Sequence, residues 1–193
     1  MPPYRPTKIT KCAGRYVARL LITELPADRL YHNLHHTIDV VQGVIAIGQA
    51  EGVSGEEAEL LILAAWFHDL GHLRTYSGHE AVSAQLAREF LRSEQYPEDK
   101  ITVVADCILA TQVPQRPQTR LQEILCDADL IHLSHTTYPQ SCDLLREEWR
   151  RVLGRTFSNT EWFAENEDFL RNHNYFTSFG KTTLQQRKER YCF

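Results

Sequence analysis

The feature that most constrains this chain is an uninterrupted apolar run, Leu60–Phe67, that leads directly into the pair His68-Asp69. The run is far too short to span a bilayer, which takes about 20 apolar residues, so we interpret it as a buried helix. The helix then delivers an imidazole and a carboxylate out of the core, and each is costly to bury unless it is paired or binds a metal. The sequence therefore predicts a helical core with polar chemistry at one helix end.

Helical periodicity recurs along almost the whole chain, whereas alternating strand patterns with hairpin turns are missing. Gly71 predicts the stop of the helix with the apolar run, because a residue without Cβ tolerates the left-handed cap. Three Ser-x-x-Glu spacings have the form of capping boxes and predict helix starts. They are Ser54 with Glu57, Ser77 with Glu80, and Ser158 with Glu161.

We therefore expect an all-α fold with one compact helical bundle over residues 1–193, core motifs within residues 31–130 and C-terminal helices that complete the core. A loop around residues 112–120 is expected to be irregular. The expected helices are Ala13–Leu25, Leu34–Glu51, one from Ser54 to the His-Asp-Leu-Gly turn, one from Ser77 to about Ser93, one from Pro97 to about Leu109, Leu121–His135, Ser141–Leu153, Glu161–Asn172 and Thr183–Tyr191.

The overall charge limits the kinds of partner that the chain can bind. A net charge of -4 and a pI near 6.1 argue against binding of nucleic acid or a membrane surface by bulk electrostatics. An anionic small molecule is still allowed, because a metal can dominate the local field. The five cysteines are scattered without a C-x-x-C pair, and the first residues lack an apolar h-region. We therefore expect a cytoplasmic protein without a disulfide framework, a nucleic-acid partner or a membrane partner.

Three histidines, His32, His35 and His36, fall within five residues. If a helix begins at Leu34, His32 and His36 lie one turn apart on the same side. Asp39 shares that side and is expected to orient an imidazole through its second nitrogen. The alternative for His32 is a hydrogen bond at the helix start without a chemical role. We expect His35 to point to the surface.

Asp127 and Asp129 interrupt an otherwise apolar helical face, which is again an expensive arrangement without a cation. Two imidazoles and two carboxylates form a borderline nitrogen and oxygen set that suits Mn, Fe, Co, Ni or Zn and holds Mg less well. Ligand type alone leaves the metal open. For Asp127 two other roles are equally open, a hydrogen bond to a ligand histidine or the cap of a neighbouring helix.

The order His36, then His68-Asp69, then Asp129 resembles the H…HD…D pattern of the HD-domain superfamily of metal-dependent phosphohydrolases. The ordered motifs cover about half of the chain. The resemblance implies a helical HD-type domain that holds a divalent metal through these four residues.

Within that superfamily, Tyr-His-Asn-x-x-His-x-x-Asp-Val at residues 31–40 resembles the first metal motif of class I cyclic-nucleotide phosphodiesterases. This likeness implies that His32 is the proton donor and His36 a metal ligand. Ala-Asp-Leu at residues 128–130 resembles the element around the last ligand, which favours Asp129 over Asp127. The chain is much shorter than those catalytic domains, it reads Leu-Gly-His-Leu-Arg after His-Asp, and it shows no purine clamp. Specificity for cyclic nucleotides is therefore not implied.

The function we expect is hydrolysis of a phosphomonoester or phosphodiester bond in a small, nucleotide-like substrate. A divalent cation neutralises phosphate charge and lowers the pKa of water toward about 7. Asp69 would bind the metal and take a proton from the attacking water, and His32 or His72 would protonate the leaving oxygen. The alternatives are a regulatory module that binds metal and nucleotide without turnover, and a di-iron oxygenase, which would need extra ligands around His72 and His79.

Several roles stay open after the His-Asp pair. His72 and His79 either line the pocket, with His79 touching substrate, or hold a second metal with Glu80, as two-metal sites do. Alternatively, His79 is an exposed helix start and Glu80 serves its capping box. Arg74 would clamp phosphate with its planar fork or is an ordinary surface arginine.

Two arginines on the irregular loop, Arg116 and Arg120, are weaker candidates for phosphate binding. The C-terminal third is rich in aromatic residues, which we expect to complete the core. They would alternatively close over a substrate or form a homodimer face. These residues are Trp149, Trp162, Phe163, Phe169, Tyr175, Phe176 and Phe179.

Overall fold

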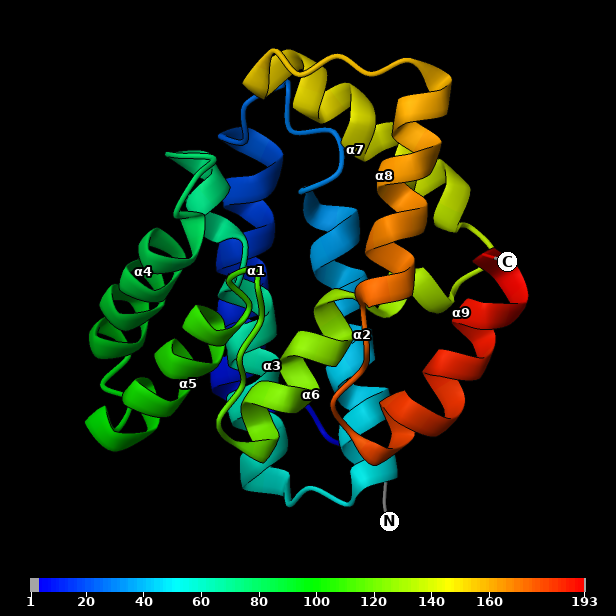
Figure 1. The fold of residues 1–193 in the computed structure, drawn as a ribbon. Coiled ribbons are helices and arrows are strands. Elements are labelled where there is room, and N and C mark those ends of the chain that lie inside the picture. Colours follow the sequence, from blue (N-terminus) through cyan, green and yellow to red (C-terminus); the bar gives the residue numbers. More distant parts are fainter. Residues whose placement is uncertain (1–3, 193) are drawn as a thin grey trace.

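The computed structural model describes residues 4–192, and every regular element in that part of the chain is helical (Figure 1). The expected all-α fold is therefore confirmed. The elements are α1 (Lys8–Thr23), α2 (Leu34–Glu51), α3 (Gly55–Phe67), the 3-10 turn η1 (Leu70–Leu73), α4 (His79–Ser93), α5 (Glu98–Ala110), α6 (Arg120–Asp129), the 3-10 turn η2 (Ile131–Ser134), α7 (Tyr138–Leu153), α8 (Asn159–Asn172), the π-helical turn η3 (Gly180–Leu184) and α9 (Gln185–Cys192).

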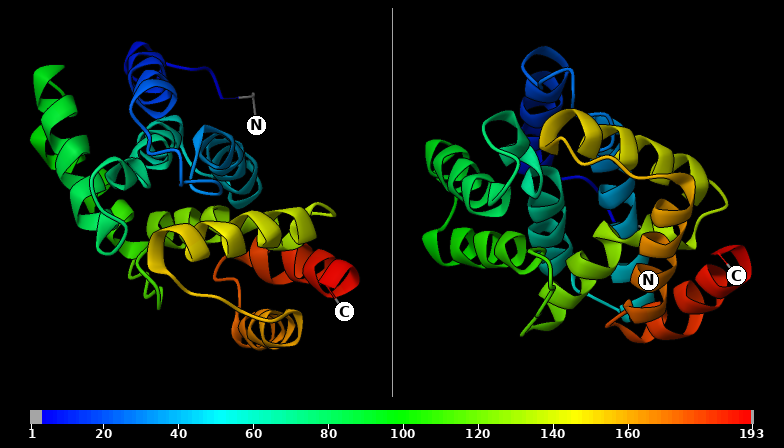
Figure 2. Two further views of the ribbon diagram at one scale, coloured as in Figure 1. Left: turned by 90° about the horizontal axis from the view of Figure 1, so that it is seen from above. Right: turned by 45° about the horizontal axis from the view of Figure 1, so that its top comes forward.

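Helices α2, α3 and α6 form the centre of the bundle, where α2 packs against both α3 and α6. Helices α4 and α5 pack against each other on one flank, and α8 and α9 lie on the opposite flank (Figures 1 and 2). The start of α2, the end of α3 and the end of α6 carry the polar residues singled out in the sequence. The packing of these three helices decides whether those residues meet.

Two of the three expected capping boxes are present. The Ser54 side chain accepts from the backbone of Glu57 and the Glu57 carboxylate accepts from the backbone of Ser54, and Ser158 repeats this arrangement with Glu161. The box expected at residues 77 and 80 is wrong. Helix α4 begins at His79 after Gly78, whose φ of 71° needs a residue without Cβ, and no side chain caps it.

Several helix bounds differ from the expected ones for local reasons. Helix α1 begins at Lys8 rather than Ala13, because the Thr7 side chain accepts a hydrogen bond from the Thr10 backbone and supplies the cap. The single helix expected over 121–135 is two elements, since α6 ends at Asp129 and η2 follows. Helices α2 and α8 end where the sequence predicts, and residues 112–119 form the expected irregular loop.

Gly71 is not the left-handed helix stop that the sequence suggested. Helix α3 ends at Phe67, and Gly71 lies inside η1 without a positive φ. A Cβ added at Gly71 would lie 2.1 Å from the carbonyl oxygen of His79. The glycine is therefore required because the start of α4 packs directly onto this turn, and that contact brings His79 next to the end of α3.

The main core gathers apolar side chains from α1 to α6, and Tyr175 and Leu184 from the C-terminal third join it. A second, smaller cluster joins Leu133, Tyr138 and Leu170 from η2, α7 and α8. Among the described residues no helix is both long and apolar enough to cross a membrane. Cys12, Cys107 and Cys126 carry free thiols, and the side chain of Cys192 lies outside the described part.

Candidate metal centre

Three helix ends bring four ligand-type residues together. His36 lies in the first turn of α2, where Asn33 caps the helix by accepting from the backbone of His35 and His36. His68 caps the end of α3 with Asp69 directly after it, and Asp129 is the last residue of α6. A close approach of α2 and α6 is possible because residue 43 is glycine; a Cβ there would lie 3.1 Å from the Ala128 Cβ.

The ligand atoms of these four residues point at one another. The His36 Nε2 lies 3.3 Å from the His68 Nε2, 3.3 Å from the Asp69 Oδ2 and 3.3 Å from the Asp129 Oδ1. The His68 Nε2 lies 3.2 Å and 3.5 Å from the same two carboxylate oxygens. Atoms about 2.1 Å from a common ion lie roughly 3.0 Å apart at octahedral angles and 3.4 Å apart at tetrahedral angles. The spacing therefore fits a single cation.

Hydrogen bonding at the edge of this set also fits a metal. The His68 Nδ1 lies 2.8 Å from the carbonyl oxygen of Ala65 and donates its proton there, so the Nε2 lone pair is free for a ligand. The Asp69 Oδ2 is buried and makes no well-formed hydrogen bond among the described residues. A buried carboxylate oxygen without a donor, facing two imidazole lone pairs, is what a divalent cation satisfies.

The pKa values of the cluster are also shifted as expected for a metal site. Burial lowers the pKa of His36, but the close carboxylates of Asp129 and Asp69 outweigh burial and raise that pKa to about 9. Burial raises the pKa of Asp69, yet the neighbouring imidazoles, His68 first, hold it well below its usual range. Asp129 shows the same balance, with His36 as the first imidazole that lowers its pKa. Protons on imidazoles thus balance two carboxylates, and metal binding would displace them.

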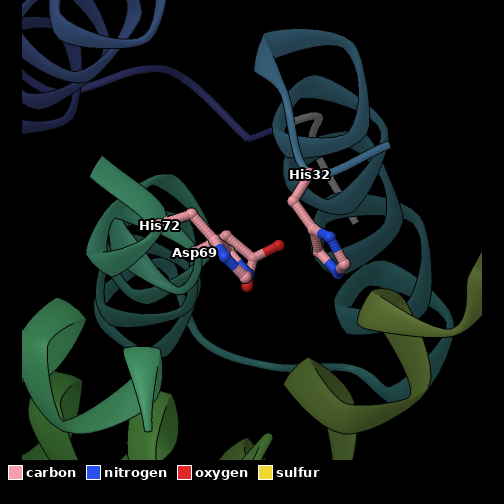
Figure 3. Close-up of side chains that lie close together, drawn as sticks. All are labelled: His32, Asp69 and His72. Atoms are coloured by element: carbon pink, nitrogen blue, oxygen red, sulfur yellow. The ribbon is translucent and has the colours of Figure 1, made fainter. Parts of the chain in front are cut away.

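A second group of polar side chains, His32 and His72, lies close to Asp69 (Figure 3). His32 precedes α2 and His72 lies in η1, and one ligand atom from each lies within 4.8 Å of the Asp69 carboxylate. The His72 ring stacks on His32 at 4.3 Å and on His79 at 3.9 Å between centroids. The His79 Nε2 lies 3.2 Å from the Asp69 Oδ1. Asp69 therefore connects the four-residue set with a row of three imidazoles.

His72 is the least satisfied side chain of that row. It is 1% exposed, and neither ring nitrogen has a hydrogen-bond partner within the described structure. Burial lowers the pKa of His72 to about 2, so the ring is neutral. A buried imidazole with two unused nitrogens is costly unless a ligand meets it.

His32 is held by a buried carboxylate from far along the chain. The Glu148 side chain on α7 accepts from the Nδ1 of His32, from the backbone N–H groups of Tyr31 and His32, and from the Tyr76 hydroxyl. Burial raises the pKa of Glu148, but these hydrogen bonds, that of His32 first, lower it to about 2. Glu148 therefore fixes the His32 ring and leaves its Nε2 for the cavity.

Tyr31 and His132 complete the wall beside His36. The Tyr31 hydroxyl lies 2.9 Å from the Nδ1 of His132, and the Tyr31 ring is tilted against the His36 ring with 4.8 Å between centroids. Burial, followed by the charge of His36, lowers the pKa of His132 to about 3, so the neutral ring accepts the hydroxyl proton. This pair packs against the His36 imidazole.

The two groups open into a cavity of about 570 Å³ whose walls include His32, Asp69, His72, His79 and Asp129. Three C-terminal aromatics also line it, Trp149 on α7 and Trp162 and Phe169 on α8. The expectation that the aromatics of this third complete the core holds for Tyr175 and for Trp162, which is buried although it also lines the cavity. It is wrong for Phe163 and Phe169, which are exposed.

Asp127 and Asp129 have separate tasks. Asp127 points away from the ligand set and accepts from the backbone of Phe176 and Thr177 and from the Thr177 hydroxyl. The hydrogen bond to a ligand histidine, one of the two roles left open by the sequence, is therefore not made. The other role was the cap of a neighbouring helix, and the donors of Asp127 lie just before η3 rather than in it. The Asp39 Oδ2 lies 3.7 Å from the Nε2 of His35 rather than against His36. The expectation that Asp39 orients the His36 imidazole is therefore wrong.

Of the remaining candidates, His35 and the three arginines lie outside the cavity, whereas Glu80 lines it. The His35 side chain is 85% exposed, as expected. Arg74 and Arg116 are exposed and absent from the cavity walls, and Arg120 donates to the carbonyl oxygen of Glu51. Glu80 is 9% exposed and lines the cavity, with one carboxylate oxygen unpaired.

Sequence reasoning missed Glu148, His132 and Tyr76, and it gave a place in the pocket only as the alternative role of the aromatics. Glu148 is 116 residues from His32, and no local pattern links the two. A signal for the aromatics exists, because Leu145, Trp149 and Leu153 recur every four residues on one face of α7. That period indicates a covered face without saying what covers it.

The sequence profile of the HD domain matches residues 33–134, slightly more than half of the chain. The chain therefore belongs to the HD domain family. Members of the HD superfamily are in general metal-dependent phosphohydrolases and typically bind divalent metals. The matched residues contain all four members of the converging set. No curated protein and no solved structure matches the chain.

Proposed function

We propose that this protein hydrolyses a phosphomonoester or phosphodiester bond in a small, nucleotide-like substrate, with a divalent cation held by His36, His68, Asp69 and Asp129. One observation carries the proposal: the four ligand atoms converge at the wall of a cavity large enough for such a substrate. Membership of the HD domain family supports it.

When bound, the cation would neutralise phosphate charge and lower the pKa of a water molecule toward about 7. The residues of the chain supply the proton transfers. Asp69 turns its Oδ2 to the ligand set and its Oδ1 to His79, so the second oxygen is placed to take the proton of the attacking water. His79 would hold that carboxylate in position from 3.2 Å.

His32 is the proton donor in this proposal. Glu148 accepts from its Nδ1, which directs Nε2 into the cavity, and the buried negative charge compensates the imidazole when both of its nitrogens carry protons. His72 lies stacked against His32 with unused nitrogens, in a position to hydrogen-bond a phosphate oxygen. The His32 and Asp69 side chains lie close together (Figure 3), so donor and acceptor would face a phosphate bound between them from two sides.

The test uses the full chain stripped with EDTA and reloaded with Mn, Co, Ni, Zn or Mg. We expect metal-dependent release of p-nitrophenolate from p-nitrophenyl phosphate or from bis(p-nitrophenyl) phosphate. His68→Ala and Asp69→Ala should abolish it, whereas the matched control His35→Ala, an exposed histidine beside a ligand, should leave it unchanged. Equal turnover in wild type and in both ligand variants would overturn the proposal.

A di-iron oxygenase is a second candidate, and it rests on the group formed by His32, Asp69 and His72, which is of a kind that holds an ion. It requires two irons per chain and consumption of O₂. Iron analysis of the anaerobically loaded protein and an oxygen electrode decide between the two. One ion per chain and no O₂ uptake would remove this candidate.

A further inference from the structure

The cavity has an apolar end that the metal chemistry does not explain. On α7, Leu145 and Trp149 line it from successive turns, and Leu153 follows one turn later. On α8, Trp162 and Phe169 line it from the same face of the helix, with Trp162 packed edge-to-face on Trp149 at 5.5 Å. Two helices that lie outside the matched family region therefore add an aromatic wall to the cavity.

Apolar surface is left exposed at the mouth of this cavity. Three of its lining residues, Val113, Leu153 and Phe169, are 68%, 41% and 40% exposed. Apolar surface that is gathered beside polar groups in a cavity is typical of a ligand site. The lining therefore offers one polar end for a phosphate and one apolar end for an organic group.

The charges of the lining disfavour a highly charged ligand. Arg155 is the one arginine among the described lining residues, which include no lysine, and its guanidinium already stacks over the Trp149 ring at 4.7 Å. Glu80 and Glu165 add negative charge at the walls beyond that of the metal ligands. A polyphosphate would place its additional charges against these carboxylates without cations to compensate them.

We propose that the site selects phosphoesters whose organic group is large and aromatic or apolar and adds little negative charge to the reacting phosphate. This inference rests on the proposed function and narrows its substrate class. The phosphate would lie against the ligand set, and the organic group would lie on Trp149, Trp162 and Phe169. The cavity of about 570 Å³ has room for both parts.

Binding of phosphonates, which are not hydrolysed, tests the inference separately from catalysis. Isothermal titration of the Mn-loaded full chain would compare methylphosphonate, 2-naphthylmethylphosphonate and the same naphthyl compound with two ring sulfonates. Stacking on an aromatic side chain gives about tenfold in affinity or more. We expect the naphthyl compound to bind at least tenfold more tightly than methylphosphonate, and the two sulfonates to remove that gain.

Variants locate the preference. Phe169→Ala should reduce the affinity ratio of the naphthyl compound over methylphosphonate to less than threefold, while the affinity for methylphosphonate itself stays within twofold. Trp149→Ala should reduce the same ratio. The matched control is Phe163→Ala, because Phe163 is on the same helix, is 70% exposed and lies outside the cavity lining. Circular dichroism melts check that each variant folds.

The possible outcomes separate the two proposals. Equal affinity for the methyl and naphthyl compounds, tighter binding of the disulfonate, or an unchanged preference in Phe169→Ala would overturn the inference. Turnover of bis(p-nitrophenyl) phosphate is measured on the same preparation. A preference for the naphthyl compound without turnover of bis(p-nitrophenyl) phosphate would count against the proposed hydrolysis alone. Turnover without this preference would count against the proposed substrate class alone.

Discussion

Glu148 anchors the candidate proton donor, and replacing it with glutamine isolates that role. The Glu148 side chain is 0% exposed and accepts from His32, from two backbone N–H groups and from Tyr76. Glutamine keeps the shape but removes the charge and presents an amide N–H₂ where one of the accepting oxygens stood. Glu148→Gln therefore tests the anchor with little change in packing.

The size of the effect follows from the pKa of Glu148, which folding lowers from 4.5 to about 2. At about 1.4 kcal/mol for each tenfold change, the charged carboxylate contributes about 3 kcal/mol to stability. Because folding lowers this pKa, the contribution is present above pH 4.5 and is lost as the pH falls toward 2. We expect Glu148→Gln to lower the free energy of unfolding by about 2–3 kcal/mol at pH 7, with the difference shrinking below pH 4.5.

Urea melts at several pH values measure this difference, and turnover of bis(p-nitrophenyl) phosphate gives kcat and KM. We expect kcat to fall roughly 10- to 100-fold with KM nearly unchanged, because a disoriented donor acts on the transition state more than on binding. Glu147→Gln is the matched control, since the neighbouring Glu147 pairs at the surface with Arg150 and Arg151. A variant that loses stability but keeps the wild-type kcat would refute the positioning role of Glu148.

Three further predictions follow from the geometry. Asp129→Asn should lose the metal in elemental analysis, because Asp129 belongs to the converging set. Asp127→Asn should keep the metal, because Asp127 accepts hydrogen bonds from the segment around Phe176 and Thr177 instead. The loss of these bonds should lower its free energy of unfolding by about 1–3 kcal/mol. Gly71→Ala should destabilise the protein by about 1–3 kcal/mol in urea melts and lower kcat, because its Cβ meets the carbonyl of His79. Adding Mn at 100 times its dissociation constant should stabilise the EDTA-stripped protein by about 2.7 kcal/mol, and no shift in the melting temperature would contradict a folded-state site.

The local parts of the fold were predictable because their causes are local. The capping boxes at Ser54 and Ser158 and the bounds of α2 depend on residues within one turn. The apolar run before His68 correctly predicted a buried helix that ends in polar residues. Gly71 was misinterpreted, because the sequence shows that a glycine is needed and not whether a positive φ or a close contact requires it.

The four candidate metal ligands could be predicted from the sequence, whereas the residues around them could not. The order of His36, His68-Asp69 and Asp129 pointed to one cluster, and the three helix ends do meet. Glu148 reaches the cluster only through tertiary packing, which a helical period does not encode. The same holds for Trp149, since an apolar stripe is equally compatible with a core contact and a ligand pocket.

The most direct test of the account is a Mn titration of the EDTA-stripped protein in which bound metal and hydrolysis of bis(p-nitrophenyl) phosphate are measured together. We predict that turnover rises in proportion to occupancy of the site, that His68→Ala loses both metal and turnover, and that His35→Ala keeps both. Hydrolysis that persists without metal, or metal that binds to His68→Ala as tightly as to wild type, would contradict the central claim.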